Sequence, residues 1–225
     1  MELDIHFESK ELLAVTKPAG MPVQPDKTGD KSLLEALSDY TGKELGLLHR
    51  LDRPVGGVML FAKTKEAESK LAKDLQAGTL QKTYLAVLTG KLPKEHDTVT
   101  DLLFKNARTN LSEVVSANRK GAKKAVLEYD RLAEKETENG ILTLAKITLH
   151  TGRHHQIRVQ TAHLNTPIWG DRKYNKDFPK RERGNIALWS YRLTGKDPKT
   201  GKPFTFSALP KEKPFSLFER ELSEL

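Results

Sequence analysis

The sequence predicts an α+β fold built on a mixed, mainly antiparallel sheet with flanking helices. Two observations carry this prediction. Strand-like segments follow one another in hairpin groups, and helices fall between these groups instead of after every strand, as a doubly wound parallel sheet would require. The 225 residues also show no repeat, low-complexity tract or clear linker, so we expect one continuous domain over residues 1–225.

The first half of the chain predicts two helices between short strands. Ser32 and Glu35 form the reciprocal pair of a capping box, which predicts a helix that starts after Ser32. Thr64 is the expected N-cap of a second helix, whose apolar stripe ends before Gly78. Strands are expected at three apolar runs, residues 12–16, 58–62 and 82–89.

The second half is richer in predicted strands. Alternating apolar residues indicate strands at 125–132 and 141–149, joined by a charged hairpin tip at 134–140. One helix, from about Arg153 to Leu164, interrupts this pattern and ends before a proline. Two further strands are expected around a turn, at 187–194 and 204–208.

Charge and cysteine content limit the classes of function. The 38 Lys and Arg against 30 Asp and Glu give a formal charge of +8, which indicates an anionic partner. The absence of cysteine excludes disulfide frameworks, Cys-ligated zinc and thiol nucleophiles. No apolar run approaches the roughly 18–20 residues of a membrane span, and the acidic N-terminus lacks the basic start of a secretory signal. We therefore expect a cytoplasmic monomer with no membrane partner.

Polar and turn-forming residues are densest at 49–57, where Asp52 lies between Arg50 and Arg53. Cationic neighbours keep a carboxylate ionised, and an ionised, positioned carboxylate can act as a nucleophile or a general base. The alternative is an ordinary solvated ion pair in a turn. A phosphate-binding loop is excluded, because the chain has no Gly-x-x-x-x-Gly-Lys-Ser/Thr sequence.

A second polar segment, residues 151–158, contains Arg153 and Arg158 at the expected start of a helix. Backbone N–H groups at a helix start, together with the two guanidinium groups, suit a phosphate or a carboxylate. The adjacent His154 and His155 do not predict a metal site, because neighbouring helical residues point about 100° apart and no third ligand is suitably spaced. The alternative is a polar helix N-terminus with one histidine as its cap.

Two aromatic features remain open between a structural and a functional interpretation. Tyr84 lies in a predicted buried strand and is either a core residue or part of a site. The basic segment from Trp169 to Arg183 also contains Tyr174 and Phe178. Its cations can neutralise phosphates and its rings can stack on unpaired bases, but a solvated charged loop would have the same composition.

In this order, the segments resemble the RluA branch of the RNA pseudouridine synthases, from about Leu12 to Pro210. The matching residues include Lys17-Pro18-Ala19-Gly20, His49-Arg50-Leu51-Asp52-Arg53-Pro54 with Gly57, Lys82-Thr83-Tyr84, Thr151-Gly152-Arg153-His154-His155-Gln156-Ile157-Arg158 and Trp169-Gly170-Asp171 with Tyr174. Val55-Gly56 stands where the family usually has Thr-Ser. None of the departures falls on the Asp52, Tyr84 or Arg158 positions.

The resemblance implies the pseudouridine synthase catalytic fold around a central cleft. It also implies isomerisation of uridine to pseudouridine in structured RNA, transfer or ribosomal, with no cofactor and no metal. Asp52 is then expected to be the catalytic carboxylate, Arg158 its ion-pair partner, and Tyr84 the aromatic residue against the target uracil. Base flipping and RNA binding are expected of three arginines, Arg50, Arg53 and Arg153.

Two other functions remain open from the sequence. A nucleic-acid N-glycosylase also needs a flipped base and an ionised aspartate near C1′, but it releases free uracil. A non-catalytic RNA-binding or ribosome-assembly module would bind RNA and leave it unmodified. Because the resemblance begins near the start of the chain, we expect no separate N-terminal RNA-binding domain.

Overall fold

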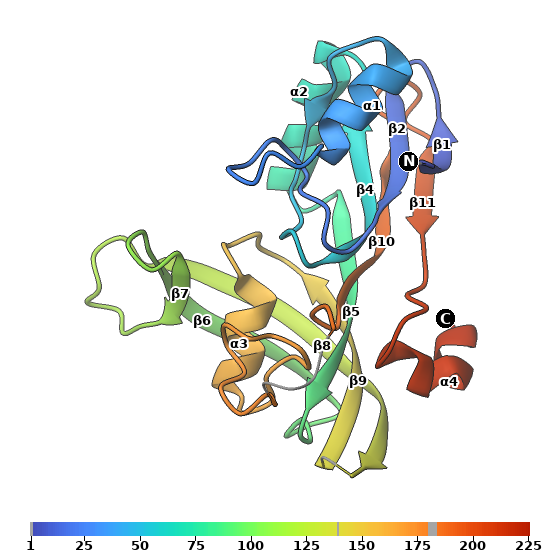
Figure 1. Cartoon of the computed structure of the whole chain (residues 1–225). Coiled ribbons are helices and arrows are strands. Elements are labelled where there is room, and N and C mark those ends of the chain that lie inside the picture. The colour runs from blue at the N-terminus through green and yellow to red at the C-terminus, as the bar shows by residue number, and fades with distance from the viewer. Residues whose placement is uncertain (1, 139, 180–183) are drawn as a thin grey trace. The chain divides into compact units, whose positions relative to one another are not determined.

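The computed structural model describes residues 2–138, 140–179 and 184–225, and the chain forms two compact units (Figure 1). Unit 1 comprises the described residues of Met1–Thr83 and Trp189–Pro210. Unit 2 comprises those of Tyr84–Leu188 and Lys211–Leu225. Each unit therefore combines segments that are far apart in the sequence. The prediction of a single domain over the whole chain stays a prediction.

Unit 1 contains a mixed sheet. Its strands are β1 (Asp4–Glu8), β2 (Leu12–Lys17), β3 (Gly46–Leu47), β4 (Gly56–Ala62), β10 (Leu188–Lys196) and β11 (Pro203–Ser207). The order is β1-β2-β4-β10, with β3 paired to β4 and β11 paired to β10. β4 and β10 run parallel, whereas the pairs β1–β2, β2–β4, β3–β4 and β10–β11 are antiparallel.

Two helices of unit 1 begin where the sequence predicts. In α1 (Leu33–Thr41) the Ser32 side chain accepts from the Glu35 N–H, and the Glu35 carboxylate accepts from the Ser32 N–H, completing the capping box. In α2 (Lys65–Gln76) the Thr64 hydroxyl accepts from the Ala67 N–H. These caps depend only on residues three positions apart, which is why a sequence pattern reveals them.

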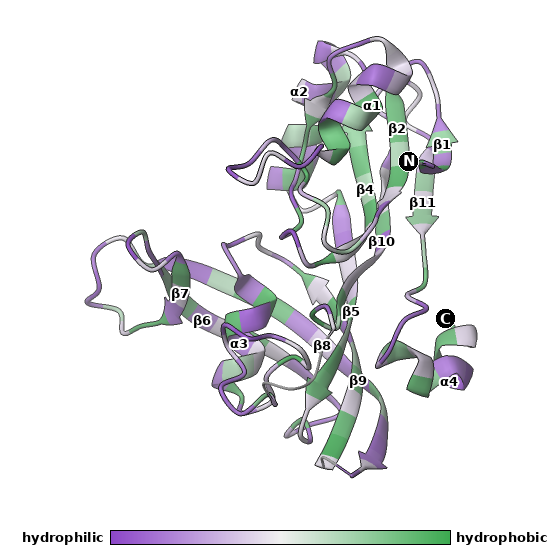
Figure 2. Cartoon of the chain, viewed as in Figure 1, coloured by the Kyte–Doolittle hydropathy of each residue, from purple (hydrophilic) through white to green (hydrophobic). Residues whose placement is uncertain are grey.

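The core of unit 1 lies between α2 and the strands. β4 is buried at every position and is coloured hydrophobic along most of its length in Figure 2. Apolar residues of β2, β4, β10 and α2 form one cluster with Leu80, which follows α2. The members are Leu12, Ala14, Val58, Leu60, Ala62, Ala67, Leu71, Leu80 and Leu193. Burial of this cluster holds the loop between β3 and β4 at the edge of a rigid layer.

Unit 2 contains a largely antiparallel sheet. Its strands are β5 (Gln81–Thr89, which begins in unit 1), β6 (His96–Asn106), β7 (Leu111–Val114), β8 (Lys123–Thr137) and β9 (Gly140–Leu149). The order is β5-β9-β8-β6-β7, and the pairs β8–β9, β6–β8 and β6–β7 are antiparallel. The helices are α3 (Gln156–His163), a short 3-10 helix (Phe215–Phe218) and α4 (Glu219–Ser223).

Two predicted boundaries in unit 2 are wrong. The charged residues 134–137 continue β8 and pair with β9, from Glu134 opposite Thr143 to Thr137 opposite Gly140, because charged side chains can stand on the solvent face of an antiparallel pair. Helix α3 starts at Gln156 instead of near Arg153, because His155 has a φ of 53° and lies outside the right-handed helical region.

The α+β class with a mixed, mainly antiparallel sheet is confirmed. Strands β1, β3, β6 and β7 were not expected from the sequence pattern. Among the described residues, none of the helices has both the length and the apolar character that a membrane crossing requires.

Candidate active site

The loop between β3 and β4 carries the predicted carboxylate of unit 1. Within this loop the Arg50 side chain is exposed and Asp52 is half-buried. The Val55 N–H donates to the Asp52 carbonyl at 2.9 Å, which closes a turn around Asp52. The Gly20 N–H donates to the Arg53 carbonyl at 2.8 Å and ties this turn to the segment after β2. Asp52 therefore stands on a short loop fixed at both sides by backbone hydrogen bonds.

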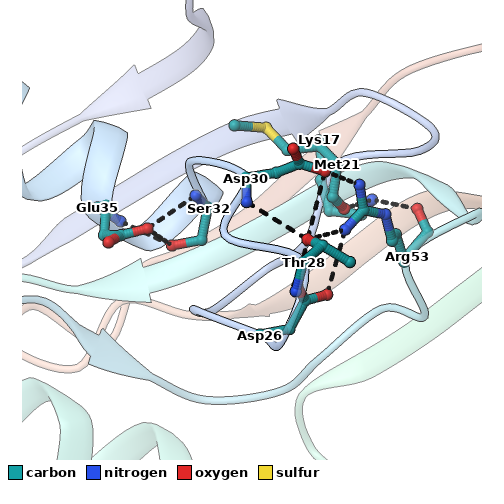
Figure 3. A network of polar contacts seen from close by, with 8 residues as sticks. All are labelled: Lys17, Met21, Asp26, Thr28, Asp30, Ser32, Glu35 and Arg53. Carbon is teal, nitrogen blue, oxygen red and sulfur yellow. Dashed lines mark hydrogen bonds and ion pairs between the residues drawn. The ribbon is translucent and has the colours of Figure 1, made fainter.

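Lys17, the last residue of β2, supports this loop from inside unit 1. Its side chain is fully buried, and Nζ donates to the Pro18 carbonyl at 2.9 Å. Nζ also donates to the carbonyls of Met21 at 2.7 Å and Arg53 at 3.0 Å (Figure 3). Burial lowers the pKa of Lys17 to about 7, while the charge of Asp52 acts in the opposite direction. Three carbonyl acceptors match the three N–H donors of an ammonium, so the geometry suits the charged form.

Arg53 is held by residues of the preceding loop. Its Nη1 donates to Asp26 Oδ2 at 3.2 Å and to Thr28 Oγ1 at 2.7 Å, and its Nη2 pairs with the Asp30 carboxylate (Figure 3). The bonds from Thr28 and from Arg53 hold the pKa of Asp26 below its usual value, and Arg53 does the same for Asp30. In this structure the predicted RNA contact Arg53 is therefore engaged by carboxylates of its own unit.

His49 is a buried, neutral side chain in the same loop. It is 8% exposed, and within the described residues neither ring nitrogen has a hydrogen-bond partner. Burial, assisted by the nearby charge of Lys82, lowers the pKa of His49 to about 3. The imidazole is therefore uncharged at neutral pH, and it fills space in the interior as a neutral side chain.

The two glycines that follow Val55 let strand β10 approach β4 closely. Gly56 lies opposite Trp189 and Gly57 opposite Ser190. A Cβ at Gly56 would overlap the Trp189 ring, and one at Gly57 would overlap the Ser190 backbone. This contact gives a physical reason for Gly56 at a position where the family usually has a larger residue.

Tyr84 is the first residue of unit 2 and lies in strand β5. Its side chain is 6% exposed, and the residues that follow it in the strand, Leu85 to Leu88, are wholly buried. A phenol within a buried strand has its ring fixed by packing. The structure thus places Tyr84 on a rigid element.

Arg158 lies on α3 and forms a buried bidentate ion pair. Its Nε donates to Asp171 Oδ2 and its Nη2 to Asp171 Oδ1, both at 2.7 Å. The side chains are 6% and 0% exposed, respectively. Asp171 Oδ1 also accepts from the Lys173 and Tyr174 N–H groups, at 3.0 and 3.4 Å. The orientation of Arg158 is therefore set by a carboxylate that is itself fixed by backbone donors.

Tyr174 connects Arg158 to the start of α3 and to β7. The Arg158 guanidinium carbon lies 5.3 Å from the centre of the Tyr174 ring. The Tyr174 hydroxyl accepts from the Ser112 N–H at 2.8 Å and lies 2.8 Å from His155 Nδ1. His154 stacks on His155 and lies 2.9 Å from Ser112 Oγ through Nδ1. These histidines thus belong to a polar network around Tyr174.

The exposed Arg153 lies on the turn before α3. Its Nε donates to the Lys124 carbonyl at 2.9 Å. The turn is capped by Gln156, whose Oε1 accepts from the Arg153 N–H at 3.0 Å and from Thr151 Oγ1 at 2.8 Å. His155, at the N-cap position, makes no capping bond through its side chain. Gln156 is therefore the cap that the sequence interpretation assigned to a histidine.

The basic segment after Trp169 is described as far as residue 179. Trp169 and Phe178 pack edge to face at 5.0 Å, and Arg172 lies 5.7 Å from the Phe178 ring. The predicted RNA-contact residues 180–183 lie outside the described residues. Trp169 and Phe178 thus pack on each other within unit 2, whereas Tyr174 packs on His155.

The structure groups the predicted residues in two sets, Arg50, Asp52 and Arg53 in unit 1 and Tyr84, Arg153 and Arg158 in unit 2. The predicted pairing of Arg158 with Asp52 joins residues of different units and stays a prediction. Sequence reasoning did not assign a role to Lys17 or Asp171. Both lie in motifs that matched the family, which was the available signal.

Comparisons with known proteins identify the family of this chain. A family model described as RNA pseudouridylate synthase matches residues 11–163. A tRNA pseudouridine synthase C of Haemophilus ducreyi is 32% identical over 225 residues, covering 93% of this chain and 91% of that protein. A ribosomal large subunit pseudouridine synthase D of Nitrosomonas europaea is 36% identical over 207 residues, covering 85% of this chain and 58% of that protein.

Solved structures show the same fold. Human RNA Pseudouridylate Synthase Domain Containing 1 superposes with a TM-score of 0.77 at 18% identity, covering 98% of this chain and 94% of that chain. Human RNA Pseudouridylate Synthase Domain Containing 4 gives 0.75 at 20% identity, covering 98% and 93%. The expected pseudouridine synthase fold is thereby confirmed, and so is the expected isomerisation of uridine to pseudouridine in RNA. The chain belongs to the RNA pseudouridylate synthase family.

Proposed function

We propose that this enzyme acts on transfer RNA and that Asp52 is its catalytic carboxylate. The observation that carries the choice of RNA is the match to the Haemophilus ducreyi tRNA pseudouridine synthase C, which extends over 93% of this chain and 91% of that protein. Similar matches to proteins of the same name in Pasteurella multocida and Vibrio parahaemolyticus add support.

The reaction is a rearrangement without net addition or loss of atoms. The bond from uracil N1 to ribose C1′ breaks, the base turns over, and C5 forms a new bond to C1′. The hydrogen on C5 leaves as a proton and N1 gains one. The enzyme must therefore act on the glycosidic bond, hold the detached base and accept a proton at C5.

Asp52 is proposed to supply the carboxylate that acts on the nucleotide. Its support within unit 1 is the half-buried position on a turn fixed by Lys17 and by backbone bonds to Val55 and Gly20. A carboxylate on such a turn is held in one place, which is what positioned catalysis requires. The ammonium of Lys17 lies close enough to interact with the charge of Asp52.

Arg158 and Tyr84 are proposed to serve the same uridine. Asp171 binds the Nε and Nη2 donors of Arg158 and so fixes the orientation of the guanidinium. The pairing of Arg158 with Asp52 is proposed on the family motifs that contain the two residues. Tyr84 is proposed to stack on the uracil ring and to take part through its hydroxyl in proton transfer at C5.

RNA contacts are proposed for Arg50, Arg53 and Arg153. Arg50 and Arg153 are exposed on turns next to the two catalytic segments. Arg53 is bound to Asp26 and Asp30, so a phosphate would have to exchange with these carboxylates. These contacts are proposed to supply the binding free energy that opens the RNA around the target uridine, because flipping a base out of a stack costs a few kcal/mol.

The proposal is tested with RNA transcripts that carry tritium at uridine C5. Conversion to pseudouridine releases tritium into water, since C5 loses its hydrogen. We expect release from transfer RNA and much less from large-subunit ribosomal RNA at equal concentration, and chromatography of the digested RNA should show pseudouridine. Mapping pseudouridines in total RNA from cells with and without the protein then identifies the uridine.

Each of the other outcomes would contradict one part of the proposed function. Release from ribosomal RNA alone would make the choice of transfer RNA wrong. Free uracil with an abasic site would indicate an N-glycosylase. Binding of RNA with neither product would indicate a non-catalytic module.

A further inference from the structure

Residues 104–124 carry most of the chain's excess positive charge. This segment comprises the end of β6, strand β7, the start of β8 and the two intervening loops (Figure 1), and we call it the basic arm. It contains one acidic residue, Glu113, and six cations, for a net charge of +5 out of +8 for the chain. The cations are Lys105, Arg108, Arg119, Lys120, Lys123 and Lys124.

All six cations of the basic arm are exposed, and none forms an ion pair among the described residues. The opposite end of the same sheet differs. There Arg131 pairs with Glu95 and Glu134, Lys135 with Glu221, and Lys146 with Asp130. Ion pairs within unit 2 therefore neutralise the cations at one end of this sheet but not those of the basic arm.

The basic arm is an ordered element joined to the catalytic helix. Arg119 stacks on the Phe104 ring at 4.2 Å, and Asn106 Oδ1 accepts from the N–H groups of Arg108 and Thr109 in the first loop. The arm meets the start of α3 at two points. Ser112 Oγ donates to the His154 carbonyl at 2.7 Å, and the Lys124 carbonyl accepts from Arg153 Nε.

We propose that the basic arm binds the phosphate backbone of the RNA substrate next to the α3 segment. The inference rests on the proposed function, because it takes RNA as the ligand. Unpaired exposed cations on one element release condensed counterions when they meet phosphates, which gives strong and salt-dependent binding. The arm's ring, Phe104, is covered by Arg119, so the arm offers charge instead of a surface for base stacking.

Binding through phosphates has a specific consequence for the reaction. The contacts carry no base sequence, so they hold the RNA without choosing the uridine. They are made equally before and during the chemical step, so their loss raises KM and leaves kcat unchanged. The basic arm therefore contributes to capture of the RNA, and the loop of Asp52 and helix α3 contribute to chemistry.

The test replaces the four lysines of the basic arm, Lys105, Lys120, Lys123 and Lys124, by glutamine. A matched variant replaces four exposed lysines of unit 1 by glutamine, Lys10, Lys43, Lys73 and Lys196, with the same change in net charge. For both, the RNA dissociation constant is measured by filter binding from 50 to 300 mM salt, and KM and kcat by tritium release. Circular dichroism melting verifies that each variant folds.

We expect the arm variant to lose about 0.7–0.9 in the slope of log affinity against log salt for each lysine that contacts a phosphate. Its KM should rise at least tenfold at 150 mM salt with kcat within about twofold, and the matched variant should change little. If the variant with four substitutions does not fold, two double variants are measured in the same way, one at Lys105 and Lys120 and one at Lys123 and Lys124.

Equal effects of the two fourfold variants, or an unchanged salt slope in the arm variant, would overturn the inference. The binding measurement does not need turnover. Failure of the proposed function appears as absence of product from the wild-type enzyme, whereas failure of the inference appears as normal RNA affinity in the arm variant.

Discussion

Two arginines of the predicted site are both held by carboxylates, but in different surroundings. Arg158 pairs with Asp171, and the two side chains are 6% and 0% exposed. Arg53 pairs with Asp26 and Asp30 at the surface, where its own side chain is 36% exposed. The buried pair is bidentate with both bonds at 2.7 Å, whereas the surface pair is shared between two loop residues.

This difference indicates different roles. A buried ion pair is difficult to exchange, because leaving one charge without its partner costs several kcal/mol. A surface pair is screened by salt and exchanges readily for another anion. Arg158 is therefore suited to a fixed orientation during chemistry, and Arg53 to contacts that form and break when RNA binds.

The largest effect is expected for Arg158→Met. Its kcat should fall about 100-fold or more, because the proposed partner of Asp52 is lost. Arg53→Met removes the same charge at the exposed position, and we expect it to raise KM a few fold while kcat stays near the wild-type value. Tritium release under saturating and limiting RNA separates these effects. An unchanged rate for Arg158→Met would mean that its pairing is unimportant.

Asp171→Asn tests the buried pair directly. The substitution removes the buried carboxylate charge that Arg158 faces, so the free energy of unfolding should fall by about 3–5 kcal/mol. Urea denaturation followed by circular dichroism gives this value. Asp39→Asn, which removes a surface partner of Lys31, serves as a control and should leave the denaturation midpoint nearly unchanged. A similar small change for Asp171→Asn would contradict the importance of burial.

His49 extends the comparison to a buried group that is neutral. Its pKa is about 3 in the folded protein, below the usual value of 6.5, so the unfolded chain binds the proton first as the pH falls. The free energy of unfolding should then decrease by about 2 kcal/mol from this group between pH 7 and pH 5. His49→Leu should remove that part of the slope. The exposed His163→Gln should keep it, and equal slopes in all three proteins would contradict the assignment.

The smallest effect is expected for the double variant Asp26→Asn with Asp30→Asn. Both carboxylates are exposed, so the free energy of unfolding should change little. Salt screens exposed charges, so even this small difference from the wild type should disappear at about 1 M salt. Freed from these residues, Arg53 should bind RNA slightly more tightly at low salt. Filter binding measures this, and weaker RNA binding would indicate that the two carboxylates orient Arg53 for its contact.

The sequence allowed prediction of features that depend on near neighbours. The capping box at Ser32 and Glu35 and the cap at Thr64 involve residues three positions apart, and both are confirmed. The succession of hairpin groups and intervening helices likewise predicted the α+β class, which is confirmed. The prediction of a hairpin tip at 134–140 was wrong, because a charged strand that faces solvent can have the same composition as a turn.

Other features depend on distant contacts. Asp171 meets Arg158 only after the chain has left α3 and turned back, so spacing alone could not reveal the pair. Lys17 donates to the carbonyl of Arg53, which is 36 positions away in the sequence. It does so from the end of a strand whose other residues are mostly apolar. The start of α3 depends on the positive φ of His155, a conformation that few residues other than glycine adopt.

The substitution Asp52→Asn tests most directly whether Asp52 is the catalytic carboxylate. The substitution removes the carboxylate charge and keeps the shape of the side chain. We expect the variant to bind transfer RNA with an affinity within a few fold of the wild type. It should form no pseudouridine, even after prolonged incubation. Measurable pseudouridine from this variant, detected by chromatography of the digested RNA, would contradict the assignment of Asp52 as the catalytic carboxylate.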